Sequence, residues 1–329
     1  MFIGLDLGTS GLKGVLIDGA QRLLAEASAP LSVSRPQDGW SEQSPADWLA
    51  AAESVLGTLA ARHPLGEVRG IGLSGQMHGA TLLDAADEVL RPCILWNDTR
   101  AEEEAAELDG DPMFRRLTGN IVFPGFTAPK LVWVARHEPR IFERVARVLL
   151  PKDFLRLWLT GEHVAEMSDA AGTSWLDTGA RDWNGDLLSA TGLSRAQMPR
   201  LVEGSEVSGT LRAELAARWG LPKGVVVAGG GGDNAASGIG AGVVQAGRTL
   251  AREWARAGIT VNTVSPGYIR TAINDAWFDT EPGKKQIAKF PKRRLMGEEG
   301  LDAMMLFLCS DASEFVTGTN FVLDDGQTL

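Results

Sequence analysis

The stretch "IGLDLGTSGLKGVLID" at residues 3–18 decides the fold, because it contains two predicted strands joined by a short turn. Apolar residues recur up to Asp6, the small residues "GTSG" at 8–11 favour a turn, and "LKGVLI" at 12–17 predicts a returning strand. Small residues also let the backbone N–H groups of the turn approach an anion. The stretch therefore predicts an antiparallel hairpin with a candidate anion site at its tip.

Asp6 stands at the end of the first predicted strand, beside this turn. A carboxylate there could hold a magnesium ion or a water bound to it. The alternative is a plain hairpin in which Asp6 bonds its own turn. The stretch is not a Walker A loop, which requires GK[ST] at the start of a helix.

Helices and strands alternate through the rest of the chain, which predicts the α/β class. A helix is expected from Ser44 and Pro45, with a buried strand to follow at 68–75. Thr99 and Glu102 fit a capping box. A second helix is expected at 151–161 and a second buried strand at 224–233.

The glycine-rich stretch "AGGGGDNAASGIG" at 228–240 surrounds a single aspartate, Asp233. A carboxylate at a strand end could take the proton from a sugar hydroxyl as that oxygen attacks phosphorus. Asp233 could instead be the N-cap of the Ala/Gly-rich helix that follows. The least favoured interpretation takes "AASGIGAG" at 235–242 as a dinucleotide fingerprint, because no alternating series of strands and helices follows it.

Two further segments have the residue types of a sugar pocket. In "SGQMHGATLLD" at 74–84, Gln76 and His78 follow a predicted strand and flank Met77. In "LWNDTR" at 95–100, Trp96 offers an apolar face beside an amide and a carboxylate. The alternatives are an ordinary interior or surface histidine and a core tryptophan beside a helix cap.

Composition narrows the classes of function. The 329 residues are enough for about two domains, and a net charge of -10 argues against nucleic-acid and anionic-membrane partners. No apolar run approaches the roughly 18 residues of a membrane span and the sequence opens without a signal core, so we expect a cytoplasmic protein. Cys93 and Cys309 belong to no CxxC pair, which indicates neither a disulfide framework nor a zinc site.

Residues 1 to about 248 resemble the FGGY carbohydrate kinases. The motifs that carry this resemblance are "IGLDLGTSGLKGVLID", "GWSEQ", "GLSGQMHGATLLD", "ILWND", "TAPKLVWV", "LLPKDFLRLWLTGE", "SDAAGTSWLD" and "VVAGGGGDNAASGIGAGVV". Within the family, the chain is most similar to members that phosphorylate D-xylulose. The resemblance implies an actin-like, ribonuclease-H-like domain with ATP and Mg²⁺ as cofactors and a small ketose as substrate.

The resemblance also implies roles for individual residues. Asp233 matches the catalytic base, and Asp6 matches the carboxylate near the metal and the phosphates. The matches to substrate contacts are Met77, His78 and Asn234, to which Gln76 and Trp96 are added from the sugar-pocket pattern. The phosphate-binding set is Gly8, Thr9, Ser10 and Lys13.

Residues 249–329 resemble a different family, the short-chain dehydrogenases. The matching stretches are "RTLAREWARAGITVNTVSPGYIRT" at 248–271 and "RLMGEEGLDAMMLFLCSDASEFVTGTNFVLDDGQT" at 294–328. This part is expected to form a partial Rossmann-type α/β segment, with a helix stopped at Gly258 and a strand around Ile259 and Val261. Tyr268 has Ala272 rather than lysine four residues on, so the family's Tyr–Lys pair for hydride transfer is absent.

The chain is thus expected to be a fusion of an N-terminal kinase half with a dehydrogenase-like tail. We expect impaired phosphorylation of D-xylulose, because a kinase of this fold closes two lobes on its substrates. The alternatives are a non-catalytic sugar-binding module and, least favoured, an NAD(P)-dependent oxidoreductase. The helix expected at "AMMLFLC" (303–309) is apolar on all sides, which predicts a homo-oligomer formed through the tail.

Overall fold

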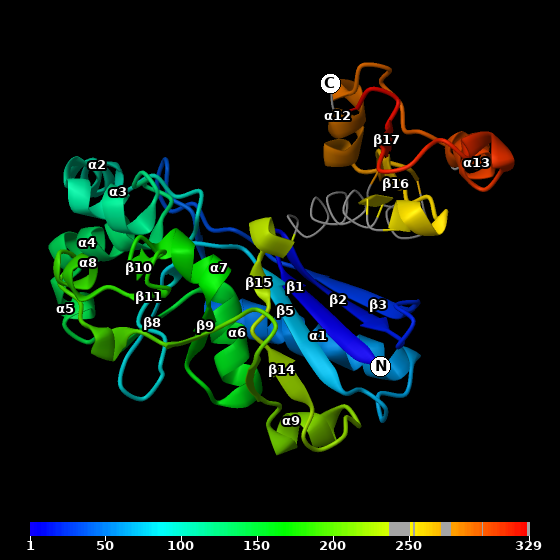
Figure 1. The fold of residues 1–329 in the computed structure, drawn as a ribbon. Coiled ribbons are helices and arrows are strands. Elements are labelled where there is room, and N and C mark those ends of the chain that lie inside the picture. Colours follow the sequence, from blue (N-terminus) through cyan, green and yellow to red (C-terminus); the bar gives the residue numbers. More distant parts are fainter. Residues whose placement is uncertain (237–250, 253, 271–277, 298, 328–329) are drawn as a thin grey trace. The chain divides into compact units, whose positions relative to one another are not determined.

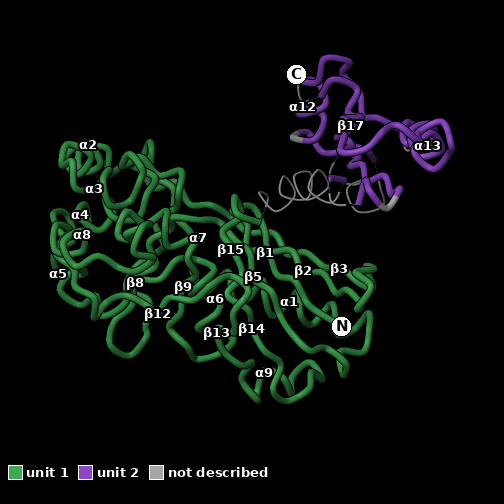
Figure 2. Tube along the Cα trace, in the orientation of Figure 1, with its two compact units in different colours: residues 1–236 green, residues 237–329 purple. Residues whose placement is uncertain are grey.

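The computed structural model describes residues 1–236, 251–252, 254–270, 278–297 and 299–327. It divides the chain into two units, residues 1–236 and residues 237–329 (Figure 2). The boundary expected near residue 248 lies outside the described residues. Each unit is described by itself below.

A seven-stranded sheet forms the centre of unit 1 (Figure 1). Its strands are β1 (Phe2–Leu7), β2 (Gly11–Ile17), β3 (Leu23–Pro30), β5 (Gly70–Gly75), β13 (Val207–Thr210), β14 (Val226–Ala228) and β15 (Gly231–Gly232). The order is β13-β14-β5-β1-β2-β3, with β15 also paired to β5. The predicted hairpin is confirmed: β1 pairs antiparallel with β2, and Asp6 lies opposite Lys13.

Helices α1 (Pro45–Arg62) and α6 (Pro151–Thr160) pack on this sheet and on one another. Alternation along β1 decides which face they cover: Ile3, Leu5 and Leu7 are buried in the core with residues of both helices. The helix predicted at Ser44 and Pro45 is confirmed, with proline in the first turn, although the Ser44 side chain makes no capping bond. α6 ends at Gly161 as expected, and a third helix, α9 (Ala213–Arg218), precedes β14.

A second layer with its own core is inserted between β5 and β13. Its helices are α2 (Glu102–Gly110), α3 (Pro112–Thr118), α4 (Thr127–His137), α5 (Pro139–Phe142), α7 (Met167–Ala170) and α8 (Gly185–Ser189). Short strand pairs join it: β4 (Glu42–Gln43) with β7 (Cys93–Ile94), β6 (Thr81–Leu83) with β8 (Arg147–Leu149), β9 (Val164–Glu166) with β12 (Arg200–Val202), and β10 (Leu176–Asp177) with β11 (Asp182–Trp183).

The capping box predicted in this layer is wrong. α2 is preceded by Ala101 and has no side-chain cap. The hydroxyl of Thr99 instead donates a hydrogen bond to the Gly39 carbonyl at 3.2 Å, a residue far away in the sequence. A tertiary contact has taken the side chain that the local pattern assigned to the helix.

The four-glycine run between β14 and Asp233 passes very close to other backbone. A Cβ atom added to Gly230, whose φ is 77°, would lie 2.0 Å from the Leu73 carbonyl oxygen. A Cβ atom on Gly229 would lie 2.2 Å from the Glu203 carbonyl oxygen. Side chains are therefore excluded at both positions. The run continues into β15, which places Asp233 just beyond the end of the sheet.

Unit 2 contains a two-stranded parallel sheet of β16 (Thr263–Pro266) and β17 (Asn320–Leu323), with helices α12 (Glu281–Lys289) and α13 (Glu299–Leu308). Gly258 has a left-handed φ of 73° and ends a helical turn, as expected. The strand expected at Ile259 begins later, at Thr263. Among the described residues of both units, the structure has no helix long and apolar enough to cross a membrane.

Candidate functional site

The candidate site of unit 1 lies where three neighbouring parallel strands end. Asp6 near the end of β1 pairs with Ser74 of β5, and Gly231 of β15 pairs with Ser74 from the other side. The loops that follow these strands begin at Gly8, Gln76 and Asp233. Ligands of open α/β sheets bind at the carboxyl ends of the strands, so this edge is the natural place for a site.

Asp233 is half-buried and begins a short helical stretch at 233–236. Its Oδ1 accepts a hydrogen bond from the N–H of Asn234 at 2.8 Å, one residue on, rather than acting as a helix cap two or three residues on. Burial raises the pKa of Asp233, and the nearby charge of Asp6 raises it further. The two carboxylates predicted to carry the chemistry therefore interact electrostatically across the strand ends.

His78 has a left-handed backbone conformation with φ of 66°. Its Nδ1 lies 2.8 Å from the Gly172 carbonyl oxygen, and its ring packs on Phe126 with centroids 4.7 Å apart. Burial, followed by the positive charge of Lys130, lowers the pKa of His78 to about 4. At neutral pH the ring is uncharged and donates from Nδ1. The lone pair of Nε2 can then accept a hydrogen bond from a hydroxyl group.

Lys130 and Thr127 fix the backbone of His78. The Nζ atom of Lys130 donates to the carbonyl oxygens of His78 at 2.9 Å and Gly125 at 2.6 Å. The Thr127 hydroxyl donates to the same His78 carbonyl at 3.2 Å. Lys130 is fully buried, which lowers its pKa to about 7. The motif "TAPK" contains both residues, but nothing in its local pattern shows that they reach His78.

Glycines make room for the two substrate-loop side chains. A Cβ atom on Gly232 would lie 2.6 Å from Cγ of Met77, and one on Gly172 would lie 2.3 Å from Cε1 of His78. Met77 thus packs against the glycine run that leads into Asp233, and both Met77 and His78 lie against Gly172.

The turn after β1 is hydrogen-bonded to the sugar-pocket segments. The Thr9 hydroxyl donates to Oε1 of Gln76 at 3.2 Å and accepts from Nε1 of Trp96 at 3.0 Å. The Gln76 amide also donates to Oε1 of Gln43 at 2.9 Å, and Gln43 donates to the Thr9 carbonyl at 2.7 Å. Gln76 is buried, and both the oxygen and the nitrogen of its amide are hydrogen-bonded to other side chains. We therefore infer that Gln76 supports the turn. Gln43, in "GWSEQ", is a part of this network that sequence reasoning missed.

Trp96 is 48% exposed and is not a core tryptophan. Its loop is held by Asp98, which accepts from the N–H of Ser41 and pairs with Arg100, both at 2.6 Å. The indole is thus a rigidly supported apolar surface beside Thr9, as a sugar ring requires. Asn234 is also exposed and follows Asp233 directly.

The hairpin turn has the groups that a phosphate and a divalent metal ion need. Within the described part of the chain, the backbone N–H groups of Thr9 and Ser10 meet no acceptor, whereas that of Gly8 closes the turn onto Gly11. Lys13 lies opposite Asp6 and pairs with Glu26 at 3.5 Å. No cluster of three metal-ligating side chains occurs among the described residues. One or two carboxylates, with phosphates and water as further ligands, are the usual Mg²⁺ set, so Asp6 and its surroundings fit such an ion.

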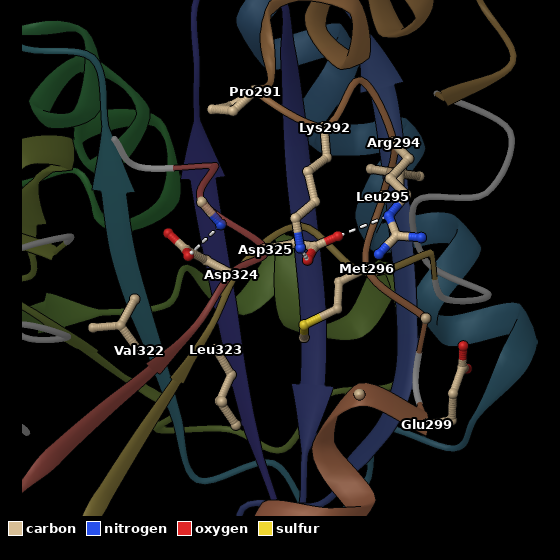
Figure 3. A pocket seen from close by; sticks show the side chains of 13 residues that line it. Pro291, Lys292, Arg294, Leu295, Met296, Glu299, Val322, Leu323, Asp324 and Asp325 are labelled. Carbon is tan, nitrogen blue, oxygen red and sulfur yellow. Dashed lines mark hydrogen bonds and ion pairs between the residues drawn. The ribbon is translucent and has the colours of Figure 1, made fainter.

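Unit 2 has a cavity of about 800 Å³ (Figure 3). Its lining includes Lys292 and Arg294, both of which pair with the carboxylate of Asp325, in the case of Arg294 at 2.8 Å. Tyr268 lies elsewhere, half exposed and stacked on Phe290. These contacts assemble no hydride-transfer site, and the position of Ala272 lies outside the described residues.

Comparison with known families identifies both parts of the chain. Residues 1–240 match the N-terminal domain of the FGGY family of carbohydrate kinases. Residues 225–328 match a family described as enoyl-(acyl carrier protein) reductase. The two resemblances found in the sequence are thus confirmed, and the matches overlap in the glycine-rich region.

Xylulose kinases are among the curated relatives. Those of Klebsiella pneumoniae and Escherichia coli K12 are each 52% identical over 251 residues, which cover 76% of this chain and 52% of the relative. A crystal structure of a xyloylose kinase from Brucella ovis matches with a TM-score of 0.71 and 67% identity, covering 71% of this chain and 49% of that one. The xylulose kinase of Rhodospirillum rubrum also has a TM-score of 0.71, at 32% identity, covering 80% and 53%.

The chain spans about half the length of the xylulose kinases that it matches. The match extends through the sheet, the hairpin turn and the glycine run that form the candidate site, and it confirms the actin-like sugar-kinase fold expected for unit 1. From the matched domain and these relatives, we conclude that the chain belongs to the FGGY family of carbohydrate kinases.

Proposed function

We propose that unit 1 is the sugar-binding half of a kinase that transfers phosphate from ATP to D-xylulose, with Asp233 as the general base. The observation that supports this most directly is the placement of Asp6 and Asp233 at the same end of one sheet, where β1 and β15 both pair with β5 at Ser74. D-xylulose is chosen because the relatives that match this half are named xylulose kinases.

The proposed reaction uses the groups at the strand ends. A sugar hydroxyl loses its proton to Asp233 while its oxygen bonds to the γ-phosphorus of ATP, and the bond from that phosphorus to the bridging oxygen breaks to release ADP. A raised pKa makes Asp233 a better proton acceptor than an ordinary aspartate. Met77, His78, Asn234 and Trp96 would hold the sugar, and Gln76 would support them.

The hairpin turn would face the phosphates. The N–H groups of Thr9 and Ser10 can donate to phosphate oxygens, with Gly8 leaving the space and Lys13 adding a positive charge. Asp6 would hold Mg²⁺ directly or through water, and the ion, when bound, would neutralise charge on the transferred phosphoryl group.

We expect this chain to transfer phosphate slowly. Phosphoryl transfer depends on positioning and on the exclusion of water, and the residues after the kinase half match a reductase family instead of continuing the kinase match. The expected rate is therefore well below that of a complete kinase, and greater than the rate of the Asp233→Asn variant.

ADP formation with D-xylulose and Mg-ATP tests the proposal. Asp233→Asn should abolish ADP formation and leave sugar binding, measured by calorimetry, within about threefold, because the amide keeps the shape and loses the base. Asp186→Asn, at a helix start in the inserted layer, is the matched control and should change neither. Equal ADP formation by the wild type and Asp233→Asn would refute the assignment of the base.

A non-catalytic sugar-binding module is the second candidate. It is favoured because the hydrogen bonds that hold the His78 and Trp96 side chains in place are made entirely by residues of unit 1. Calorimetry with D-xylulose and no nucleotide separates the candidates: binding with no ADP formation, at any enzyme concentration, supports the module.

A further inference from the structure

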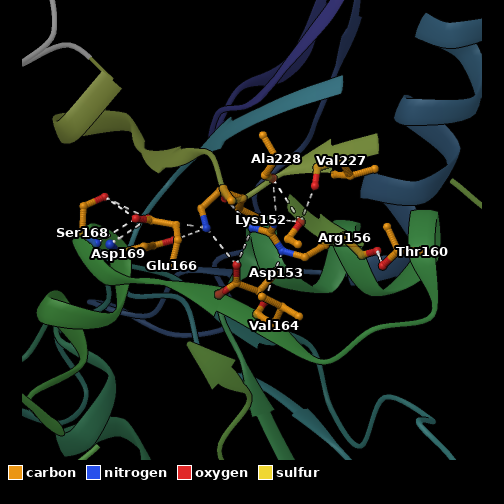
Figure 4. A network of polar contacts seen from close by, with 12 residues as sticks. Lys152, Asp153, Arg156, Thr160, Val164, Glu166, Ser168, Asp169, Val227 and Ala228 are labelled. Carbon is orange, nitrogen blue, oxygen red and sulfur yellow. Dashed lines mark hydrogen bonds and ion pairs between the residues drawn. The ribbon is translucent and has the colours of Figure 1, made fainter. Parts of the chain in front are cut away.

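Five charged side chains form a buried cluster (Figure 4). They are Lys152, Asp153, Arg156, Glu166 and Asp169. None of them has a part in the proposed chemistry. Burying ions is costly, and a well-packed apolar group of the same size is often no less stable, so the cluster calls for an explanation other than stability.

Arg156 connects the cluster to the glycine run. Its guanidinium donates to the carbonyl oxygens of Ala228 at 2.8 Å and Gly229 at 2.7 Å, the two residues at which β14 ends and the glycine run begins. It also donates to the Ser208 hydroxyl at 2.7 Å and pairs with Asp153 at 3.2 Å. The planar guanidinium thus binds two successive backbone carbonyls, a geometry that lysine cannot reproduce.

Lys152 supports the other end of the glycine run. Its Nζ lies 2.8 Å from Asp153, 3.3 Å from Asp169 and 3.7 Å from Glu166. Glu166 accepts hydrogen bonds from the N–H groups of Ser168 at 2.7 Å and Asp169 at 2.9 Å, which caps α7. α7 in turn packs against β15, the strand that leads into Asp233.

A run of glycines has no side chains with which to anchor itself, and its conformational freedom is large. Here the anchors come from outside, on the carbonyls at one end and through α7 at the other. Both supports begin on one turn of α6, at residues 152–156. The glycine run is therefore held relative to α6, which packs on β5, the strand next to β1.

We propose that Arg156 is a positioning residue that holds the glycine run at 229–232, so that Asp233 stays at the end of the sheet at which Asp6 also lies. The consequence for phosphate transfer depends on the function proposed above, whereas the consequence for the glycine run does not. The experiment therefore measures the glycine run first.

Hydrogen exchange of the full chain, followed by mass spectrometry, measures the protection of the glycine run directly. The N–H groups of Gly229 and Gly230 donate to Glu206 and Gly204 at 2.8 Å, so a peptide covering residues 226–233 should be protected in the wild type. Arg156→Met should raise its exchange rate at least tenfold, and Arg156→Lys should raise it by a smaller factor. Ser208→Ala removes one partner of the guanidinium and the bonds that the hydroxyl itself donates to the carbonyls of Val227 and Ala228, and it should raise exchange by a smaller factor than Arg156→Met.

Arg91→Met is the matched control, since Arg91 is a buried arginine that pairs with Glu42 and Glu138, away from the glycine run. It should leave exchange at 226–233 as in the wild type. The proposal is overturned if Arg156→Met leaves the exchange of that peptide unchanged. It is also overturned if Arg156→Met and Arg91→Met raise exchange equally throughout unit 1. Should Arg156→Met fail to fold, Arg156→Lys decides alone: unchanged exchange at 226–233 overturns the proposal, and a selective increase supports it.

A second readout separates positioning from general loosening. The pKa of Asp233, followed by carbon NMR, should fall towards the ordinary aspartate value in Arg156→Lys, because displacement of the glycine run moves the carboxylate away from Asp6. Where ADP formation is measurable, the same variant should lower kcat and leave the KM for D-xylulose within about twofold. If the exchange results hold and Asp233→Asn transfers phosphate normally, the proposed function fails and the positioning role stands.

Discussion

The indole Nε1 of Trp96 donates a hydrogen bond to the hydroxyl of Thr9 at 3.0 Å. This bond connects a loop expected to hold the sugar with a turn expected to hold phosphate. Its two ends are 87 residues apart in the sequence: Thr9 follows β1 of the seven-stranded sheet, and Trp96 follows β7 of the two-stranded β4-β7 sheet. The first prediction concerns this bond.

Trp96→Phe should weaken D-xylulose binding by about two- to tenfold, the usual cost of one lost hydrogen bond. The melting temperature should hardly change, because Trp96 is half exposed. Calorimetry and thermal denaturation check the two results. Trp254→Phe, at a tryptophan of similar exposure in unit 2, is the control and should leave the affinity intact. An equal loss in both variants would contradict the assignment of Trp96.

Asp6→Asn should lower the pKa of Asp233. Burial raises that pKa and the Asp6 charge adds to the effect, so removing the charge removes one of the two causes that raise it. Carbon NMR of the aspartate carboxyls measures the shift without requiring turnover. Asp47→Asn, in the first turn of α1, should not change it. A pKa of Asp233 that is the same in wild type and Asp6→Asn would show that the two carboxylates do not interact.

Lys130→Met should abolish part of the pH dependence of stability. Burial lowers the pKa of Lys130 from 10.5 to about 7, so between these values the unfolded chain holds a proton that the folded chain has released. The free energy of unfolding should therefore rise with pH in this window, by at most about 1.4 kcal/mol per pH unit from this group.

Urea denaturation at pH 7.5 and 9.5 gives the slope. It should be smaller in Lys130→Met than in the wild type, and unchanged in Lys223→Met, an exposed lysine before β14. Identical slopes in all three proteins would mean that Lys130 stays charged in the folded state. The same variant should bind D-xylulose more weakly, because the carbonyl of His78 loses one of its two donors.

Gly172→Ala should displace the His78 ring. The new methyl group would lie 2.3 Å from Cε1, and the ring is confined by the Gly172 carbonyl and by Phe126. We expect D-xylulose affinity to fall at least tenfold, measured by calorimetry. Gly185→Ala, where an added Cβ meets nothing within 4 Å, is the matched control. Wild-type affinity in Gly172→Ala would show that His78 does not contact the sugar.

Self-association through the tail remains a prediction. α13 has no fully buried side chain among its described residues, and Leu306 is 72% exposed. Leu306→Lys should reduce the mass measured by light scattering at high protein concentration, because a charged side chain would have to be buried in the contact. Leu23→Lys, on the edge strand of unit 1, should not. A monomeric wild-type protein at the same concentration would refute the prediction.

Local patterns predicted the parts of the site that the backbone itself builds. The hairpin of β1 and β2, the helix at Pro45 and the aspartate after the glycine run each depend on a few adjacent residues, and each lies where expected. The family resemblance, rather than a local pattern, pointed to Met77 and His78, and the structure places Met77 against Gly232, next to Asp233.

Supports that act across the fold could not be read from local sequence. Lys130 reaches a carbonyl 52 residues away and Gln43 an amide 33 residues away, and neither has a periodicity or spacing that marks it. The failed capping box at Thr99 has the same origin, since a distant carbonyl took the hydroxyl. The hydrogen-bond partners of buried polar residues are determined only when the layers pack together.

The pairing of β15 with β5 has a consequence for the sequence that follows. β15, which leads into the proposed base, takes its register from Ser74 and Gly75, which lie much earlier in the chain. The strand pairing that positions Asp233 is therefore formed entirely by residues before position 236, and it does not require any particular sequence after that position.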